Sequence, residues 1–162
     1  MRLFVFSVLL GCLYICKAQD IVAGALTVKT PAPATGKYVV YTETTITFDL
    51  AYTVTEAASP TAVKVYFSDA AGTKKTTPEV TATGANAPGG TEVTADGTYS
   101  DLVAKITLDA ANCVDYTKLC VNIEISGTDQ NLDDNKKCND YGTNAAEAGT
   151  AVCADVAAAH SH

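Results

Sequence analysis

The sequence predicts an all-β protein, a single antiparallel β-sandwich of about seven strands with a disulfide-anchored C-terminal tail. Apolar and polar residues alternate with a period of two through the central part of the chain, which places one set of side chains in a core and the other toward water. Turn-forming residues interrupt these stretches, and no amphipathic helical pattern lies between them. Four cysteines fall in the last fifty residues, where they can staple a tail.

The most regular alternation covers residues 45–55. Its even positions are apolar, whereas threonine and aspartate occupy most of the positions between them, so we expect the even positions to face the core. They are Ile46, Phe48, Leu50, Tyr52 and Val54. Similar patterns predict further strands over residues 21–29, 62–68, 102–108 and 119–126, and weaker ones around Val80 and Val93.

The N-terminal segment has the features of a secretory signal peptide. One early charge, Arg2, precedes an apolar run, and Cys16 and Ala18 are small residues at the two positions that a signal peptidase reads. We therefore expect cleavage before Gln19 and a secreted, extracellular protein. The predicted organisation is a signal peptide over residues 1–18, a sandwich domain over residues 19–142 and an alanine-rich tail over residues 143–162.

The charge balance of the mature chain excludes two classes of partner. Removal of the signal peptide leaves nine basic residues, all lysine, against eighteen acidic ones, which is a net charge of -9. A chain without arginine and with this negative balance lacks the electrostatic footprint of nucleic-acid or anionic-membrane binding. No later stretch is long and apolar enough for membrane insertion. The expected partner is an extracellular protein or matrix component.

Four cysteines remain in the mature chain, Cys113, Cys120, Cys138 and Cys153, and they allow three pairings. Their spacing lacks the short Cys-x2-4-Cys unit of structural zinc sites, and export favours oxidation to disulfides. In the strand over residues 119–126 Cys120 alternates with the apolar positions, so we expect it to point away from the core, as a surface staple. The order along the chain favours Cys113 with Cys120 and Cys138 with Cys153, and the other two pairings stay open.

An acidic segment near the end of the domain admits two interpretations. Asp129, Asn131 and Asp133 alternate as the first three ligands of an EF-hand do, and Asp140 falls at the twelfth position, which predicts a calcium loop. The sixth position requires glycine in such a loop but is Asp134 here, and no helical pattern flanks the segment. These departures favour a solvated hairpin loop, with weak calcium binding of the extracellular kind as the alternative. No other cofactor is expected.

A family resemblance lies in the same region. Residues 119–125 read Leu-Cys-Val-Asn-Ile-Glu-Ile, residues 129–135 read Asp-Gln-Asn-Leu-Asp-Asp-Asn, and residues 136–138 read Lys-Lys-Cys. This succession resembles the last hairpin of CARDB-type domains, a cell-adhesion-related group with immunoglobulin-like folds. Residues 101–108 resemble the strand that precedes it. The matching turn positions are Asp129, Asp133, Asp134 and Asn135.

The chain departs from that family pattern in two respects. Asn135 is isolated where an asparagine pair is usual, and the four cysteines are additional. Over residues 19–142 the resemblance implies an immunoglobulin-like sandwich that binds or adheres, and it implies no catalytic residue.

Three classes of function follow. The first is a non-enzymatic extracellular recognition or adhesion module, and the second is an extracellular structural or matrix protein associated with calcium or mineral. A small secreted enzyme is the third. The only histidines, His160 and His162, lie at the extreme C-terminus, and the mature chain has neither tryptophan nor arginine, so no catalytic residue is predicted.

The signal peptide generates the first testable prediction. The secreted protein should begin at Gln19, with its amino group free or cyclised to pyroglutamate, because the cleavage signal ends at Ala18. The intact mass of native secreted material measures this. A secreted form that retains Met1 would contradict the prediction.

Overall fold

The computed structural model describes residues 18–30, 43–74, 79–107 and 118–140. These residues form strands, bridges and turns without a helix, so the all-β prediction is confirmed for this part of the chain. Residues 1–17 of the predicted signal peptide and the alanine-rich tail lie outside the described residues. The strands are β1 (Asp20–Thr30), β2 (Glu43–Glu56), β3 (Pro60–Ser68), β4 (Val80–Thr81), β5 (Gly97–Thr107), β6 (Lys118–Ile125) and β7 (Lys136–Asp140).

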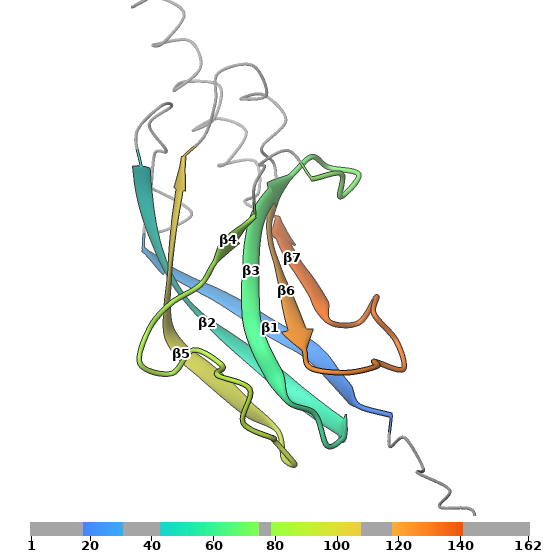
Figure 1. Cartoon of the computed structure of the whole chain (residues 1–162). Helices are drawn as coiled ribbons and strands as arrows, with labels where there is room; N and C mark the ends of the chain where they lie inside the picture. The colour runs from blue at the N-terminus through green and yellow to red at the C-terminus, as the bar shows by residue number, and fades with distance from the viewer. Residues whose placement is uncertain (1–17, 31–42, 75–78, 108–117, 141–162) are drawn as a thin grey trace, which may run out of the picture.

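The strands form two antiparallel sheets, one in the order β1-β2-β5 and the other in the order β4-β3-β6-β7 (Figure 1). Each sheet turns one face toward the other, and the side chains between them form a single hydrophobic core. Most strand boundaries lie close to the predicted ones, but β3 already begins at Pro60, and β5 begins at Gly97, whereas its start was predicted at residue 102. The weak pattern around Val93 gives only an isolated bridge to Ala58, and Leu108 lies outside the described residues.

The period of two predicted the core positions correctly. In β2, Ile46, Phe48 and Leu50 are fully buried, while Tyr52 and Val54 are partly buried and pack against the core. The facing sheet supplies Val63, Val65, Phe67, Leu119, Val121 and Ile123, all nearly or wholly inaccessible to water. Burial of each such side chain contributes about 1.5 to 3 kcal/mol to folding, which makes this layer the main source of stability.

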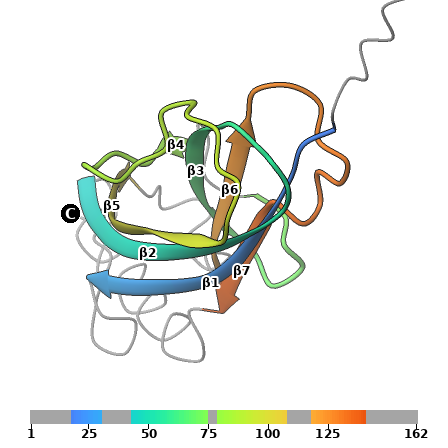
Figure 2. The ribbon, with the colours of Figure 1, turned by 90° about the horizontal axis from the view of Figure 1, so that it is seen from below.

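Backbone hydrogen bonds join the two sheets along both sides of the sandwich. On one side Thr83 and Val103 exchange two bonds of 2.8 Å, which link the chain after β4 to β5. On the other side the amide of Ala23 in β1 donates to the carbonyl oxygen of Asp134 at 2.9 Å, and the side-chain amide of Asn139 in β7 donates to the carbonyl oxygen of Leu26. Figure 2 shows β1 passing beside β7 on this side. The first strand therefore contacts both sheets.

A bulge between β2 and β5 is held by an ion-pair cluster. The register shifts between Phe48 and Leu50, and Asp101 takes a left-handed backbone conformation with φ 55°. The amide of Asp101 donates to Asp49 Oδ1 at 2.8 Å, and Lys29 Nζ lies 2.7 Å from a carboxylate oxygen of each aspartate. The hydrogen bonds from Lys29 and from the Asp101 amide lower the pKa of Asp49. Because the cluster is exposed, it serves mainly to fix local geometry.

The described disulfide joins Cys120 in β6 to Cys138 in β7, so the predicted pairing of Cys113 with Cys120 and Cys138 with Cys153 is wrong. The two residues are direct partners in the antiparallel register, with their Cα atoms 4.1 Å apart. Cys113 and Cys153 lie outside the described residues. Hairpin register, not order along the chain, decides this bond.

Cys120 is also buried, whereas the alternation predicted a disulfide at the surface. It stands outside the hydrophobic core cluster, as expected, yet its exposure is 0%. Tyr66 lies opposite it in β3, and Ser68 Oγ lies 3.2 Å from its sulfur. Both neighbours are buried too, so this end of the β3-β6-β7 sheet is covered on each face.

The register makes the disulfide directly testable. Trypsin, which cleaves after Lys118, Lys136 and Lys137, should release under non-reducing conditions a peptide containing Cys120 that is linked to one beginning at Cys138. Because the second peptide also contains Cys153, a further cleavage after Glu147 is needed to separate the two cysteines. Mass spectrometry then reads the linkage. A peptide joining Cys113 to Cys120 would contradict the register.

Candidate functional site

The loop between β6 and β7, residues 126–135, folds back onto the start of β1. Gln19 is the point of contact. Its amide donates to the carbonyl oxygen of Thr128 at 3.2 Å, and its carbonyl oxygen accepts from the amide of Gln130 at 3.0 Å. Its side chain donates to the carbonyl oxygen of Ser126 and accepts from the amide of Ser59 at 2.8 Å. These bonds hold the first strand and the last hairpin together.

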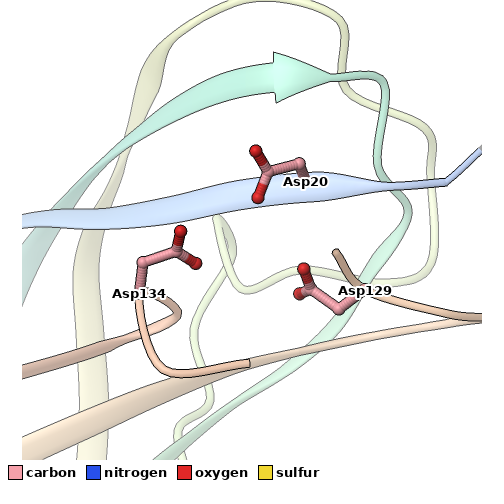
Figure 3. Close-up of side chains that lie close together, drawn as sticks. All are labelled: Asp20, Asp129 and Asp134. Atoms are coloured by element: carbon pink, nitrogen blue, oxygen red, sulfur yellow. The ribbon is translucent and has the colours of Figure 1, made fainter. Parts of the chain in front are cut away.

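This backbone arrangement brings three carboxylates together. Asp20 extends from the first position of β1, while Asp129 and Asp134 extend from the two ends of the loop segment that faces it. Figure 3 shows the three side chains pointing toward one another. One carboxylate oxygen from each lies within 4.8 Å of the other two. Aspartate oxygens at this spacing are the ligand type that hard divalent cations prefer.

Hydrogen bonds within the loop orient two of the three carboxylates. Asp129 Oδ1 accepts from the amide of Asn131 at 3.0 Å, and Asp129 Oδ2 accepts from Nδ2 of Asn135. Asn131 Nδ2 donates to Asp134 Oδ2 at 3.0 Å. The asparagine and aspartate side chains of the loop thus hydrogen-bond to the loop backbone and to one another, as expected of a polar hairpin loop.

Several buried oxygens of the cluster nevertheless have no hydrogen-bond partner. They are Asp20 Oδ1, Asp134 Oδ1 and Asn135 Oδ1. Asn135 is only 2% exposed, and its carboxamide faces the cluster because Nδ2 donates to Asp129. In the described part of the chain the only other such atom is the hydroxyl oxygen of Tyr99. Buried polar atoms are normally paired, so this concentration marks the cluster as a place where a partner belongs.

Burial and the neighbouring like charges raise the pKa of Asp134. Loss of solvent around the carboxylate is the largest cause, followed by repulsion from Asp20 and from Asp129, and the hydrogen bond from Asn131 opposes them. Within the described residues no lysine pairs with any of the three carboxylates. The cluster therefore favours a bound proton or a bound cation.

The four predicted calcium ligands are not all brought together. Asp129 is in the cluster, and Asn131 orients Asp134 through its side-chain amide. Asp133 is turned to solvent, with its side chain 94% exposed and an oxygen 3.8 Å from Lys136 Nζ. Asp140 stands in β7 opposite Lys118, away from the loop along the strand, and its side chain lies outside the described residues.

The predicted ligand set did not include Asp20 or Asp134, which are in the cluster, or Asn135, which contacts it. Nothing in the local sequence signals Asp20, because its neighbours in space come from the other end of the domain. Asn135 appeared only as a position of the family resemblance, and Asp134 appeared there and as a departure from the EF-hand pattern. The segment lies between two strands and brings Asp20 into the cluster, so its arrangement is not that of an EF-hand loop.

A groove of about 440 Å³ lies beside the cluster, between β3, β6 and the β6–β7 loop. Its polar lining includes Thr61, Asn122, Glu124 and Lys136, and Leu132 from the loop forms part of its rim. Leu132 is 68% exposed, and among the described residues no other large hydrophobic side chain is exposed. Asn135 lines the groove and also contacts Asp129, so it connects the groove to the cluster.

The raised pKa of Asp134 predicts how stability changes in the presence of a chelator. Asp134→Asn should raise the free energy of unfolding at pH 7 by about 0.5 kcal/mol, since it removes one of three like charges and solvent screens part of the repulsion. The gain should fade as pH falls toward 3.8, the ordinary pKa of the carboxyl group, because the wild-type side chain then takes up a proton in the folded state.

Urea unfolding at a series of pH values measures this effect. Asp133→Asn is the matched control, because it makes the same change in the same loop at an exposed side chain and should leave stability nearly unchanged. A loss of stability in Asp134→Asn at pH 7 with chelator present would show that the carboxylates do not repel one another as described.

Within residues 18–30, 43–74, 79–107 and 118–140, no helix is long and apolar enough to cross a membrane. No protein-family model, curated protein or solved structure matches the chain. The groove and the carboxylate cluster are therefore the features from which a function can be inferred.

Proposed function

We propose that the chain is a secreted, non-enzymatic recognition or adhesion module with an immunoglobulin-like sandwich. The groove beside the exposed Leu132 carries this proposal. Leu132 can give a partner an apolar contact, and the polar groups of the groove can surround that contact, as in the apolar centre and polar rim of protein interfaces. The buried disulfide between Cys120 and Cys138 is compatible with an oxidising, extracellular compartment.

The strand order supports the immunoglobulin-like part of the proposal. Lettered in chain order, β1, β2 and β5 correspond to strands A, B and E, and β3, β6 and β7 correspond to C, F and G. The short β4 joins the C strand, as C′ does in variable-type domains. The disulfide joins the F and G positions instead of crossing between the sheets, so the cystine of antibody domains is replaced by a cross-strand bond.

The groove suits a protein partner that inserts one apolar side chain beside Leu132 and makes polar contacts around it. Asn122 and Thr61 offer hydrogen-bonding groups, and Glu124 and Lys136 offer charges of both signs. Glu124 also forms an ion pair with Lys64, whose Nζ lies 3.7 Å from Glu124 Oε2. These polar groups would orient the partner and give specificity, while burial of Leu132 would give affinity.

Partner capture tests the proposal. Immobilised mature protein should retain a defined protein from the extracellular fluid of its source tissue, and Leu132→Asp should reduce that retention at least about tenfold, because it places a charge in the apolar contact. Quantitative mass spectrometry of the eluates measures the reduction.

The control is Thr53→Asp, which adds the same charge at an exposed position of the other sheet and should retain the partner as the wild type does. Equal retention by wild type and Leu132→Asp would contradict a recognition role for this surface. Recovery of all three proteins with insoluble matrix would favour the structural class of function instead.

A further inference from the structure

The carboxylate cluster has two properties that point to a ligand. Its three acidic side chains carry like charges without a basic partner among the described residues, and the buried oxygens Asp20 Oδ1 and Asp134 Oδ1 accept no hydrogen bond. The buried side chain of Asn135 reaches the cluster through Nδ2, and its Oδ1 also has no hydrogen-bond partner. A cation would satisfy the three carboxylates together, whereas a single proton can be shared by at most two of them.

The Asn135 carboxamide can act as a ligand after one rotation. In the structure its Nδ2 donates to Asp129 Oδ2. A half turn about the Cβ–Cγ bond exchanges the positions of nitrogen and oxygen, so that Oδ1 lies toward the Asp129 carboxylate. Two oxygens face each other in this way only when a cation or a proton lies between them, and with a cation both oxygens are ligands. The rotation would therefore convert a hydrogen bond into a pair of ligands.

The spacing and the ligand types select calcium over magnesium. Oxygens on opposite sides of Ca²⁺ are about 4.6 to 5.2 Å apart, because each Ca–O distance is about 2.3 to 2.6 Å. The carboxylate oxygens of the cluster, which lie within 4.8 Å of one another, fit inside that sphere. Mg²⁺ keeps several waters and is usually held by one or two carboxylates, so a site of three carboxylates and one carbonyl suits it poorly.

The backbone positions the ligands before any ion arrives. Asp20 follows Gln19, which is tied to Thr128 and Gln130 on either side of Asp129, and the carbonyl oxygen of Asp134 accepts from the Ala23 amide. If cleavage occurs before Gln19, its ammonium group adds one positive charge beside three negative ones, so the cluster keeps a net negative charge. Preorganised ligands lose little entropy when they bind.

We propose that Asp20, Asp129, Asp134 and Asn135 form a calcium site that fastens the start of β1 to the β6–β7 loop. Water molecules complete the coordination sphere. The segment from Asp129 to Asn135 also carries Leu132, so a bound ion holds the rim of the groove in place. The site exists whether or not the groove binds a partner, and the experiment below does not use partner binding.

Calcium titration of the mature secreted protein tests the site. The protein is freed of metal with EDTA and dialysed, and its melting temperature is followed from 0.01 to about 10 mM CaCl₂ at constant ionic strength. With a Kd of about 0.1 to 1 mM, typical of extracellular modules, the melting temperature should rise by about 3 to 10 °C at the highest concentration. MgCl₂ should need at least a tenfold higher concentration for the same rise.

Isosteric variants locate the effect. Asp20→Asn and Asp134→Asn should lose the calcium-dependent rise, whereas the matched variant Asp133→Asn should keep it, because that side chain is turned to solvent. The difference in melting temperature between Asp134→Asn and the wild type should also change sign. The variant should melt above the wild type in EDTA and below it at the highest calcium concentration. General screening of charge cannot produce this reversal, because ionic strength is constant.

Equilibrium dialysis with radioactive calcium gives an independent readout, expected to be one ion per wild-type chain and at least tenfold weaker binding to Asp134→Asn. If Asp20→Asn does not fold, the comparison of Asp134→Asn with Asp133→Asn decides the matter. The proposal is overturned if the wild type shows neither stabilisation nor binding over this range. It is equally overturned if Asp134→Asn responds to calcium as the wild type does.

Discussion

The hydrogen bonds between the start of β1 and the β6–β7 loop are the constraint on which the site depends. β1 pairs with β2 along its length, so it belongs to the first sheet. At the same time the backbones of Gln19 and Ala23 bond to the loop that connects the last two strands of the second sheet. The apolar core holds the sheets face to face, and these bonds close the sandwich along one side. Backbone groups that leave water must find partners, so the loop cannot move away without cost.

This closure forces acidic side chains together. Asp20 directly follows Gln19, which bonds to the residues on either side of Asp129, and the carbonyl oxygen of Asp134 accepts from Ala23. The three carboxylates therefore stay close together while these backbone bonds persist. Loss of solvent and repulsion from Asp20 and Asp129 raise the pKa of Asp134, and buried oxygens of Asp20 and Asp134 have no hydrogen-bond partner. Either a proton or a cation relieves this repulsion, and the two compete for the same oxygens. Stability of this end of the molecule is therefore expected to respond to both pH and calcium.

The last hairpin is held from two directions. The Cys120–Cys138 bond links β6 to β7 within the strands, and the contacts with β1 hold the loop beyond them. Leu132 lies between Asp129 and Asp134 and is exposed where the groove opens. A loop anchored on both sides can present an apolar side chain to a partner without a large loss of conformational entropy on binding. The acidic cluster and the groove are thus adjacent parts of one surface, connected through Asn135.

The sequence by itself determined the strands and their inward faces. The alternation around Phe48, Val65 and Val121 depends only on the pleat of a strand, which repeats every second residue, so local pattern was sufficient. The same pattern placed Cys120 off the hydrophobic core, but it could not show that this face of β6 is also covered. Burial on the outer face of β6 depends on segments that are distant in sequence, so the alternation of residues within the strand cannot predict it.

Only the tertiary structure decided the disulfide and the carboxylate cluster. Cys120 meets Cys138 because of the hairpin register, and the spacing of cysteines along the chain does not contain that register. Asp20 meets Asp129 and Asp134 because the chain at the start of β1 bonds to the β6–β7 loop of the other sheet, which brings the two ends of the domain together. Side chains that are distant in sequence become neighbours only through packing, so no motif along the chain could name them. Asp129 could be proposed from sequence because the acidic turn is local, whereas Asp20 could not, because its role depends on where the first strand is held.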